Sequence, residues 1–382
     1  MRGNELLQGL VGFGVLNFWI TAALGFAWIM ARAFRRRAAI RHLIRLIALM
    51  ALLTLPVLAR LSPAHYPLRV PLPAAVSKVA LSFVAPRHAT YPVDRSGGMP
   101  TGAGSDVKTP HHPSPATNWR LVAISLVALW VGGAFLFALR PFVAFFGMRN
   151  LHRSSGIGRL AALDQSALEK HVSLRRGWEL RFDKVGKAPT AMTWGFFRPI
   201  VLLPRDAVQW SEDRRQAVLL HELAHVQRAD SLTQILAYCV CTLYWFHPAV
   251  WLTAKAMRLD AECAADDTVL RSGIKPSVYA HELMQMVRES RDRHMPSGLV
   301  GVAFFGRSKI ESRINAIIDR NLERGGVSWG DAQIALAFSV LIVTSMVVLR
   351  PSVTVSVRTE KTHFMHSLDR LLVRSWLRFR ST

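Results

Sequence analysis

Long apolar segments alternate with charged ones along this chain. Three of them carry no charge at all, namely residues 6–31, 121–139 and 332–349, which are roughly 26, 19 and 18 residues long, close to the length that spans a bilayer. A fourth, residues 42–61, contains one arginine near each end, where a long side chain can reach the lipid headgroups. A helix of about 20 apolar residues crosses the roughly 30 Å hydrocarbon core of a bilayer. The pattern therefore predicts four membrane helices.

The basic connector between the first two apolar segments predicts their orientation. It reads "RAFRRRAAIRHLIR" and holds six arginines in a short loop. Short loops rich in Lys and Arg stay on the cytoplasmic side of a membrane. The first segment is also too long for the apolar core of a signal peptide, which favours a retained anchor. We therefore expect the N-terminus outside, residues 63–118 outside and residues 150–330 in the cytoplasm.

This topology divides the chain into six parts. They are two transmembrane helices with a basic connector (1–62), an external loop rich in Pro, Ser and Gly (63–118), a third transmembrane helix (119–148), a cytoplasmic domain (149–330), a fourth transmembrane helix (331–350) and a basic amphipathic tail (351–382). The tail separates leucines from arginines on a helical projection, which is typical of a helix lying on an anionic membrane surface. Its positive charge argues against an external C-terminus.

The net charge bears on the binding partners of the chain, and the cysteines bear on whether it forms disulfides. Lys plus Arg exceed Asp plus Glu by 48 − 25 = 23, while 51% of the residues are hydrophobic. Lipid contact accounts for the basic surplus, and the sequence contains no motif for direct nucleic-acid binding. The three cysteines fall in the predicted cytoplasmic part, where thiols stay reduced and no disulfide framework is expected.

The stretch "HELAH" at 221–225 has the spacing of a zinc-peptidase motif. On a helix, His221 and His225 lie one turn apart and can point at one ion. Glu222 lies about 100° round the helix from His221, where a carboxylate can accept a proton from the attacking water. A short motif also arises by chance, and "HELMQ" at 281–285 shares its first three residues without the second histidine. The motif alone is suggestive rather than decisive.

A catalytic zinc site needs a third protein ligand and one open position. The segment "MRLDAECAADDTVLRSG" has helical composition and ends at Gly273, a residue type that favours a left-handed cap. Within it, Glu262 and Asp266 are four residues apart and share one face. Glu262 can complete a His, His, Glu site, and Asp266 can accept the free ring N–H of a ligand histidine. An exposed helix glutamate is an equally good interpretation of Glu262 on spacing alone.

Four segments, in this order, resemble the BlaR/MecR-type antirepressor membrane metallopeptidases. They are "TWGFFRPIVLLP" (193–204), "LLHELAHVQRAD" (219–230), "YWFHPAVW" (244–251) and "RLDAECAADDTVL" (258–270). The resemblance covers the four predicted membrane helices and the whole cytoplasmic domain. It implies a multi-pass α-helical protein of the bacterial inner membrane, with a cytoplasmic α+β gluzincin-like zinc metallopeptidase domain.

Position by position, the resemblance implies roles for five residues. His221, His225 and Glu262 match the ligands of a single Zn²⁺, Glu222 matches the catalytic base, and Asp266 matches the carboxylate that orients a ligand histidine. One departure is visible, because the family often has cysteine just before that aspartate and this chain has alanine. Neither role needs a thiol, so activity is still expected.

The resemblance implies a regulatory endopeptidase whose protein substrate is cytoplasmic, such as a transcriptional repressor. The same zinc chemistry would also serve a membrane quality-control or maturation peptidase. A third alternative is a non-catalytic signal-transducing scaffold, although a scaffold has no need of a base beside a metal. The lipid bilayer is the other expected partner, and a homodimer is compatible with the sequence.

In the β-lactam transducers a penicillin-binding domain follows the last membrane helix, and the tail at 351–382 is too short for one. We therefore expect that β-lactams do not acylate this chain.

The run "MTWGFFRPIVLLP" at 192–204 is rich in strand-forming residues and carries Gly195, Pro199 and Pro204. Proline is tolerated in edge strands because it cannot donate to a ladder, so the run predicts an edge strand. The free edge could hold an extended peptide by strand addition. An ordinary edge strand ended by proline is the simpler alternative.

Residues 231–254 carry no formal charge and could be a fifth membrane helix. Pro248 interrupts the run, however, and a full crossing would place Glu262 on the opposite side of the membrane from His225. We therefore predict a helical hairpin, either buried in the domain or dipped into the bilayer surface. His247, beside the proline, could be a ligand or oxyanion donor, but a structural role is more common for such a residue.

Overall fold

The computed structural model describes residues 2–61, 119–158, 177–188, 190–292 and 307–348, together with a few positions between 168 and 174. The predicted external loop (63–118) and amphipathic tail (351–382) lie outside the described residues. Nearly all described residues belong to the larger of two compact units, which comprises Asn17–Ala64 and Leu126–Leu349.

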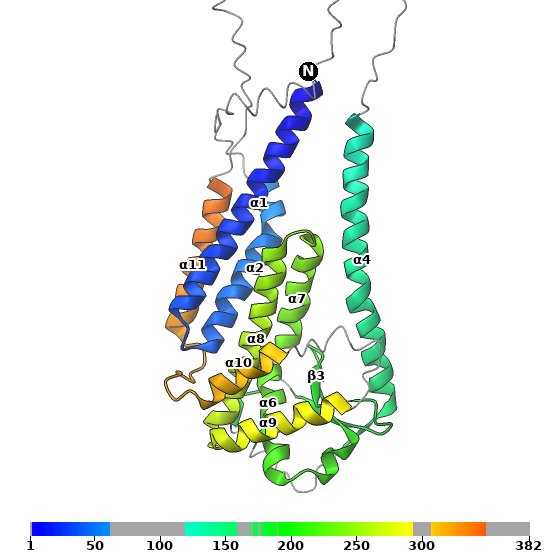
Figure 1. Cartoon of the computed structure of the whole chain (residues 1–382), viewed down its shortest axis with the longest axis vertical. Coiled ribbons are helices and arrows are strands. Elements are labelled where there is room, and N and C mark those ends of the chain that lie inside the picture. The colour runs from blue at the N-terminus through cyan, green and yellow to red at the C-terminus, as the bar shows by residue number, and fades with distance from the viewer. Residues whose placement is uncertain are drawn as a thin grey trace, which may run out of the picture. The chain divides into compact units, whose positions relative to one another are not determined.

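Helices occupy all four segments that were predicted to cross the membrane. They are α1 (Arg2–Ala33), α2 (Ala38–Leu61), α4 (Trp119–Ser154) and α11 (Trp329–Val348). Two stretches of the described residues, Gly12–Ala33 in α1 and Leu121–Ser154 in α4, are long and apolar enough to cross a membrane by length and composition. Crossing by α2 and α11, which pack against each other (Figure 1), stays a prediction.

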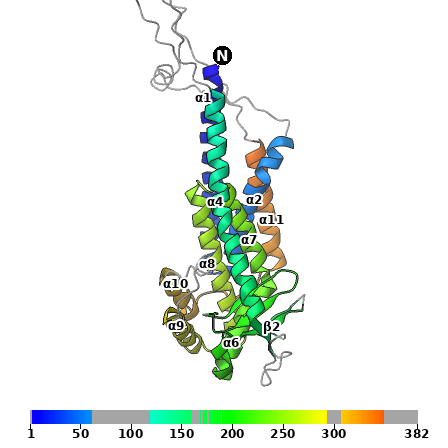
Figure 2. The ribbon, with the colours of Figure 1, turned by 90° about the vertical axis from the view of Figure 1, so that its right-hand side faces the viewer.

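The uncharged run at 231–254 lies in the predicted helical hairpin. Its arms are α7 (Asp230–Leu243) and α8 (Pro248–Arg271), which pack on each other and on α2 (Figure 1 and, turned by 90°, Figure 2). Pro248 occupies the first turn of α8, where its missing N–H leaves no hydrogen bond unmade. Gly273 follows the end of α8 with φ of 96°, the left-handed conformation predicted for this cap.

Two arginines near the start of α2, Arg41 and Arg45, face the hairpin. Arg41 Nε donates to Asp260 Oδ1 of α8 over 2.8 Å, and Arg45 forms an ion pair with the same carboxylate. His42 Nδ1 lies 3.1 Å from the carbonyl oxygen of Met257 on α8. These three polar side chains of α2 are therefore paired inside the protein, as expected for charges near lipid.

A four-stranded sheet lies beside the helices, with strand order β1-β2-β4-β3. The strands are β1 (Ser155–Ile157), β2 (Glu179–Asp183), β3 (Met192–Trp194) and β4 (Ile200–Leu203). β2 and β4 are parallel, and the other two pairs are antiparallel. The sequence prediction of a single edge strand across 192–204 is therefore wrong in part, because the run forms two strands. β3 is the edge and β4 is interior.

Gly195 explains why this run folds back on itself. It has φ of 88°, and a Cβ at this position would lie 2.6 Å from the carbonyl oxygen of Arg198. Only glycine tolerates both conditions, so the chain can leave β3 in a tight turn and return as β4. Sequence periodicity has no means of showing this turn.

α6 (Glu212–Arg228) packs on β3 and β4 and carries the HELAH motif into the core. Ser211 caps the helix by accepting the Arg214 N–H, and acidic residues fill the first turn, where they favour the positive end of the helix dipole. Leu220 and Leu223 on its inner face are fully buried against Leu203 of β4 and neighbouring side chains. Burying a leucine contributes roughly 1.5–3 kcal/mol, so this packing holds α6 in place.

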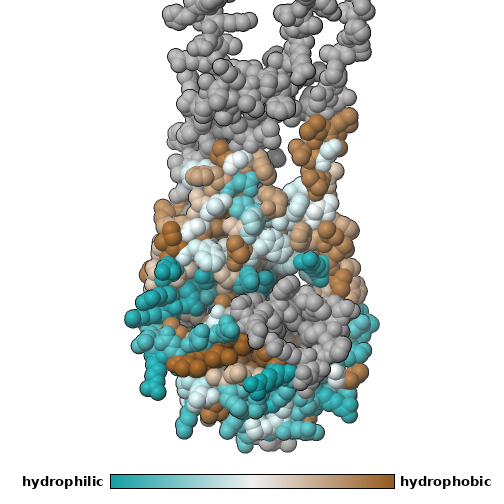
Figure 3. Space-filling view, in the orientation of Figure 1, coloured by the Kyte–Doolittle hydropathy of each residue, from teal (hydrophilic) through white to brown (hydrophobic). Residues whose placement is uncertain are grey.

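The remaining described elements are the 3-10 helix η1 (Arg205–Gln209), α9 (Pro276–Asp292) and α10 (Arg307–Ile318). α9 and α10 pack on each other, and α10 also packs on α8. Apolar side chains gather on the surface over the upper part of α4 (Figure 3), which agrees with the many exposed large hydrophobic residues on that helix. A helix with such a surface is suited to lipid.

Candidate metal centre

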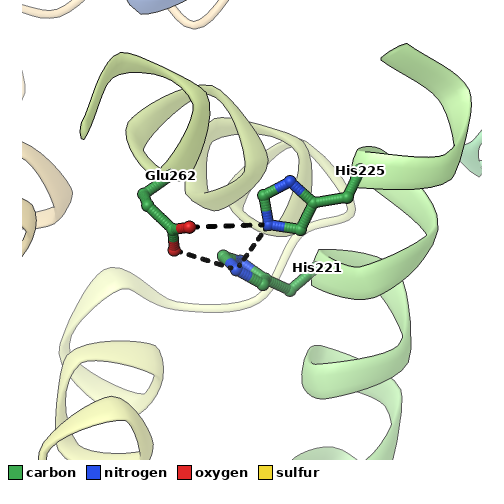
Figure 4. A group of neighbouring side chains, drawn as sticks. All are labelled: His221, His225 and Glu262. Atoms are coloured by element: carbon green, nitrogen blue, oxygen red, sulfur yellow. Dashed lines mark hydrogen bonds and ion pairs between the residues drawn. The ribbon is translucent and has the colours of Figure 1, made fainter. Parts of the chain in front are cut away.

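α6 places His221 and His225 one turn apart on one face, with their Nε2 atoms 3.3 Å apart. Glu262 of α8 faces them (Figure 4), with Oε2 lying 3.6 Å from His221 Nε2 and Oε1 lying 3.9 Å from His225 Nε2. One ligand atom from each of the three residues lies within 4.8 Å of the others. The two halves of the predicted ligand set, far apart in sequence, therefore meet at one point.

The spacing of these atoms fits a zinc ion. Bonds of about 2.0–2.2 Å in a tetrahedral arrangement place neighbouring ligand atoms roughly 3.3–3.6 Å apart. The separations of 3.3, 3.6 and 3.9 Å found here are close to that geometry. Two imidazole nitrogens and one carboxylate oxygen also form the donor set typical of catalytic zinc, which leaves a fourth position open.

A buried carboxylate holds the other ring nitrogen of each histidine. Asp266 Oδ1 lies 3.1 Å from His221 Nδ1, and Asp230 Oδ2 lies 2.6 Å from His225 Nδ1. Both aspartates are almost fully buried. An acceptor at Nδ1 favours the tautomer that leaves Nε2 free, so both rings present a lone pair to the same point.

Asp266 was predicted to contact a ligand histidine, whereas Asp230 was missed. Between α6 and α7 the chain turns sharply at Ala229, which has φ of 55°, a left-handed conformation that is uncommon for alanine. The turn brings Asp230 back toward His225, and Arg228 Nη2 donates to Asp230 Oδ2 over 2.5 Å. A carboxylate directly after the motif helix was the only sequence signal for this contact.

Arg313 of α10 joins both acidic residues of α8. Arg313 is 3% exposed. Its guanidinium donates to Asp266 Oδ1 over 2.7 Å and to Asp266 Oδ2 over 2.8 Å. Its Nη1 lies 3.0 Å from Glu262 Oε2. Tyr279 of α9 donates its hydroxyl to Asp266 Oδ1 over 2.7 Å. Sequence reasoning missed both residues. The available signal was an arginine on the face of "SKIESRINAII" that otherwise carries isoleucines.

These contacts keep the acidic groups ionised. Burial alone would raise the pKa of Glu262 and of Asp266, but Arg313 and then His221 hold both well below their usual range. Burial lowers the pKa of His221, yet its contacts with Asp266 and Glu262 outweigh that effect and raise it to about 9. Glu262 therefore presents an ionised carboxylate to the two histidines, which suits a cation at this point.

Glu222 points to the edge of the sheet. It is 8% exposed, and Oε2 accepts a hydrogen bond of 2.6 Å from Thr193 Oγ1 on the edge strand β3. The structure thus ties the predicted base to the strand that was predicted to hold a peptide. The sequence predicted no contact for Thr193.

Two other histidines considered from the sequence lie elsewhere. His247 directly precedes α8, far along the chain from Glu262. Its Nε2 lies 3.3 Å from Thr21 Oγ1 of α1. His281 of the "HELMQ" stretch is on α9, and its neighbour Glu282 lies 3.6 Å from Arg214. Neither histidine belongs to the group of three.

The chain is similar in sequence to a family of known proteins. The family model described as BlaR1 peptidase M56 matches residues 14–317. Regulatory protein BlaR1 of Bacillus licheniformis is 26% identical over 195 residues, covering 49% of this chain and 32% of that protein. Methicillin resistance mecR1 protein of Staphylococcus aureus (strain Mu50) is 23% identical over 158 residues, covering 39% of this chain and 26% of that protein, and the Staphylococcus epidermidis protein gives the same values.

The matched part spans about a third or less of the length of these relatives. The family match, in contrast, covers most of this chain and includes both α6 and α8. The chain therefore belongs to the BlaR1 peptidase M56 family, a family of membrane peptidases.

Proposed function

We propose that this protein is an integral membrane zinc endopeptidase that cleaves a cytoplasmic protein. The observation that carries the proposal is the meeting of His221, His225 and Glu262, whose ligand atoms lie within 4.8 Å of one another. Glu222, on the same helix as the histidines, adds a buried carboxylate next to them. A binding module has no need of this combination, which argues against a non-catalytic scaffold.

Zinc held by His221, His225 and Glu262 would polarise the scissile carbonyl and make the attacking water more acidic. Glu222 accepts the proton of that water and delivers it to the leaving amine. Because Thr193 donates to one carboxylate oxygen of Glu222, proton transfer would use the other oxygen. Asp266 and Asp230 stabilise the histidine orientation throughout.

β3 supports the choice of a peptide substrate. It is the edge of the sheet, and its Thr193 contacts the proposed base. An extended peptide added to this edge would run past Glu222 through main-chain hydrogen bonds, which require little of its sequence. Selectivity would then depend on what brings the substrate to the cleft.

The basic connector between α1 and α2 supports a multi-pass inner-membrane protein whose gluzincin-like peptidase domain faces the cytoplasm. We place the peptidase in regulatory signal transduction, with a transcriptional repressor as the substrate. The relatives support this, because one is named a regulatory protein. A membrane quality-control or maturation peptidase uses the same chemistry and is the main alternative.

The chemistry is tested with Glu222→Gln in purified full-length protein. We expect about one zinc per chain in both wild type and variant, and loss of proteolysis in the variant alone, because zinc has a complete ligand set without Glu222. Glu282→Gln, in the "HELMQ" stretch, is the matched control and should keep activity. Unchanged cleavage by Glu222→Gln would exclude Glu222 as the base, and absence of metal would exclude the zinc site.

The substrate class is tested by profiling new protein N-termini in cells that express wild type or Glu222→Gln. A small set of cleaved cytoplasmic proteins that includes a repressor supports the regulatory role. Many cleaved, damaged membrane proteins would instead support quality control. Identical profiles under every stress tried would favour the scaffold.

A further inference from the structure

The turn of the α7–α8 hairpin reaches the middle of helices predicted to cross the membrane (Figure 1). Tyr244 in the turn donates its hydroxyl to the carbonyl oxygen of Leu52 on α2 over 3.0 Å. Trp130 Nε1 on α4 donates to the carbonyl oxygen of Leu243 over 3.1 Å. Leu52 and Trp130 both lie near the centres of their predicted spans, 42–61 and 121–139. Two membrane helices therefore place the turn at one level, close to the bilayer centre.

Aromatic packing against α4 holds the turn at that level. Trp245 Nε1 donates to the carbonyl oxygen of Trp130 over 3.2 Å, and its ring stacks on Phe137 at a centroid distance of 6.1 Å. A Cβ on Gly133 would lie 2.3 Å from the Trp245 ring, so the indole fills the space that glycine leaves. Trp251 of α8 packs on the same phenylalanine at 5.1 Å.

Polar side chains near the turn bond to α1. His247 Nε2 lies 3.3 Å from Thr21 Oγ1, and Trp28 Nε1 donates to Thr253 Oγ1 over 3.0 Å. His247 and Thr253 are both buried. Inside a bilayer, polar groups must find partners within the protein, and these pairs provide them for His247 Nε2, Thr253 Oγ1 and the Trp28 indole.

The outer face of the hairpin is apolar and exposed. Ile235 on α7 is 61% exposed and Leu252 on α8 is 56% exposed. Cys239 on α7 is exposed as well. No residue from 231 to 254 carries a formal charge, and Asp230 and Lys255 flank the run. Contact of such an apolar face with lipid tails costs no free energy, whereas its contact with water is unfavourable.

We propose that the α7–α8 hairpin enters the cytoplasmic leaflet and reaches the middle of the bilayer, with lipid acyl chains covering its outer face. The proposal concerns a lipid contact and does not depend on the chemistry at Glu222. It goes further than the two placements that the sequence left open for residues 231–254, burial in the domain or a dip into the bilayer surface, since neither would extend to the centre of α2 and α4.

The placement also sets the height of the metal centre. Pro248 and Glu262 are 14 residues apart on α8, or about 21 Å at 1.5 Å per residue. Half of the hydrocarbon core is about 15 Å thick. With the turn at the centre, Glu262 lies a few residues beyond the hydrocarbon edge, at the level of the headgroups. A protein substrate must then bring its scissile bond to the membrane surface.

The experiment measures the depth of labels in full-length protein reconstituted into phosphatidylcholine vesicles. A fluorophore is attached to Cys239, to Leu252→Cys and, as a control, to Val208→Cys of η1, which is 63% exposed. The last two variants also carry Cys239→Ser. Each label is quenched either by lipids with a nitroxide deep or shallow in the acyl chain, or by aqueous iodide.

We expect the labels at 239 and 252 to be quenched several-fold more strongly by the deep nitroxide than the label at 208, and iodide to show the opposite order. Iodide quenching at 239 and 252 equal to that at 208 would overturn the proposal. Quenching by the shallow nitroxide alone would also overturn it, because the hairpin would then lie on the surface. Since no readout involves proteolysis, an inactive enzyme leaves the result intact.

Discussion

Arg313 is the buried cation on which the acidic side of the metal centre depends. It makes two hydrogen bonds to Asp266, of 2.7 and 2.8 Å, and an ion pair of 3.0 Å with Glu262. Replacing it by methionine keeps much of the apolar volume and removes the charge. The substitution therefore tests the electrostatic balance of the centre without opening a large cavity.

The magnitude follows from the burial of the groups left behind. Removing one partner of a buried ion pair costs about 3–5 kcal/mol, because the other charge stays in a low-dielectric place. Asp266 is 2% exposed and bears this cost in full, whereas Glu262 is 27% exposed and bears less. We expect Arg313→Met to lower the free energy of unfolding by about 3–5 kcal/mol, which corresponds to a Tm drop on the order of 10 °C.

The assay is thermal unfolding of purified protein in detergent, with a chelator or with added zinc. A bound zinc ion would place a cation beside Glu262, so zinc should restore more of the lost Tm in Arg313→Met than it adds to wild type. Glu311→Gln, exposed on the same helix, is the matched control and should stay within about 0.5 kcal/mol of wild type. Arg313→Lys keeps the charge but not the paired hydrogen bonds, so its Tm should lie between those of wild type and Arg313→Met.

A Tm of Arg313→Met equal to that of Glu311→Gln in chelator would refute this reasoning. It would mean that Asp266 is protonated or hydrated in the folded protein and does not need the guanidinium. If the Tm falls strongly and zinc does not reduce the loss, Arg313 stabilises the fold but is not coupled to metal binding.

Three further predictions follow from single contacts. Thr193→Val frees the carboxylate of Glu222 and should lower kcat roughly tenfold at unchanged zinc content, because a hydrogen bond to a charged group is worth about 1.5–3 kcal/mol; equal kcat in a peptide-cleavage assay would contradict this. Gly133→Ala should lower Tm, because its Cβ would meet an indole ring at 2.3 Å, whereas Gly132→Ala has nothing within 4 Å and should not. Burial and then the neighbouring aspartate raise the pKa of Asp267 to about 6 from 3.8. Since the folded form binds the proton more tightly, the ionised group destabilises the fold above pH 6 and this effect fades as the pH falls toward 3.8. Asp267→Asn should therefore raise Tm above pH 6, with a gain that shrinks in acid, and a gain independent of pH would count against this account.

The sequence by itself determined the features that depend on local geometry. The spacing of His221 and His225 suffices to place both imidazoles on one helix face, because helical periodicity is a property of the backbone. The same reasoning paired Glu262 with Asp266. The hairpin at 231–254 was also predictable, because the two halves of one metal site must lie on the same side of a membrane.

The tertiary structure alone decided which groups surround those residues. Asp230 reaches His225 only because Ala229 adopts a left-handed conformation, and Thr193 reaches Glu222 only because β3 is the edge of the sheet. Arg313 is 47 residues from its partner Asp266 along the chain and lies on a different helix. Such contacts result from the packing of whole helices and strands, in which many small burial energies add up, and no short-range pattern encodes that sum.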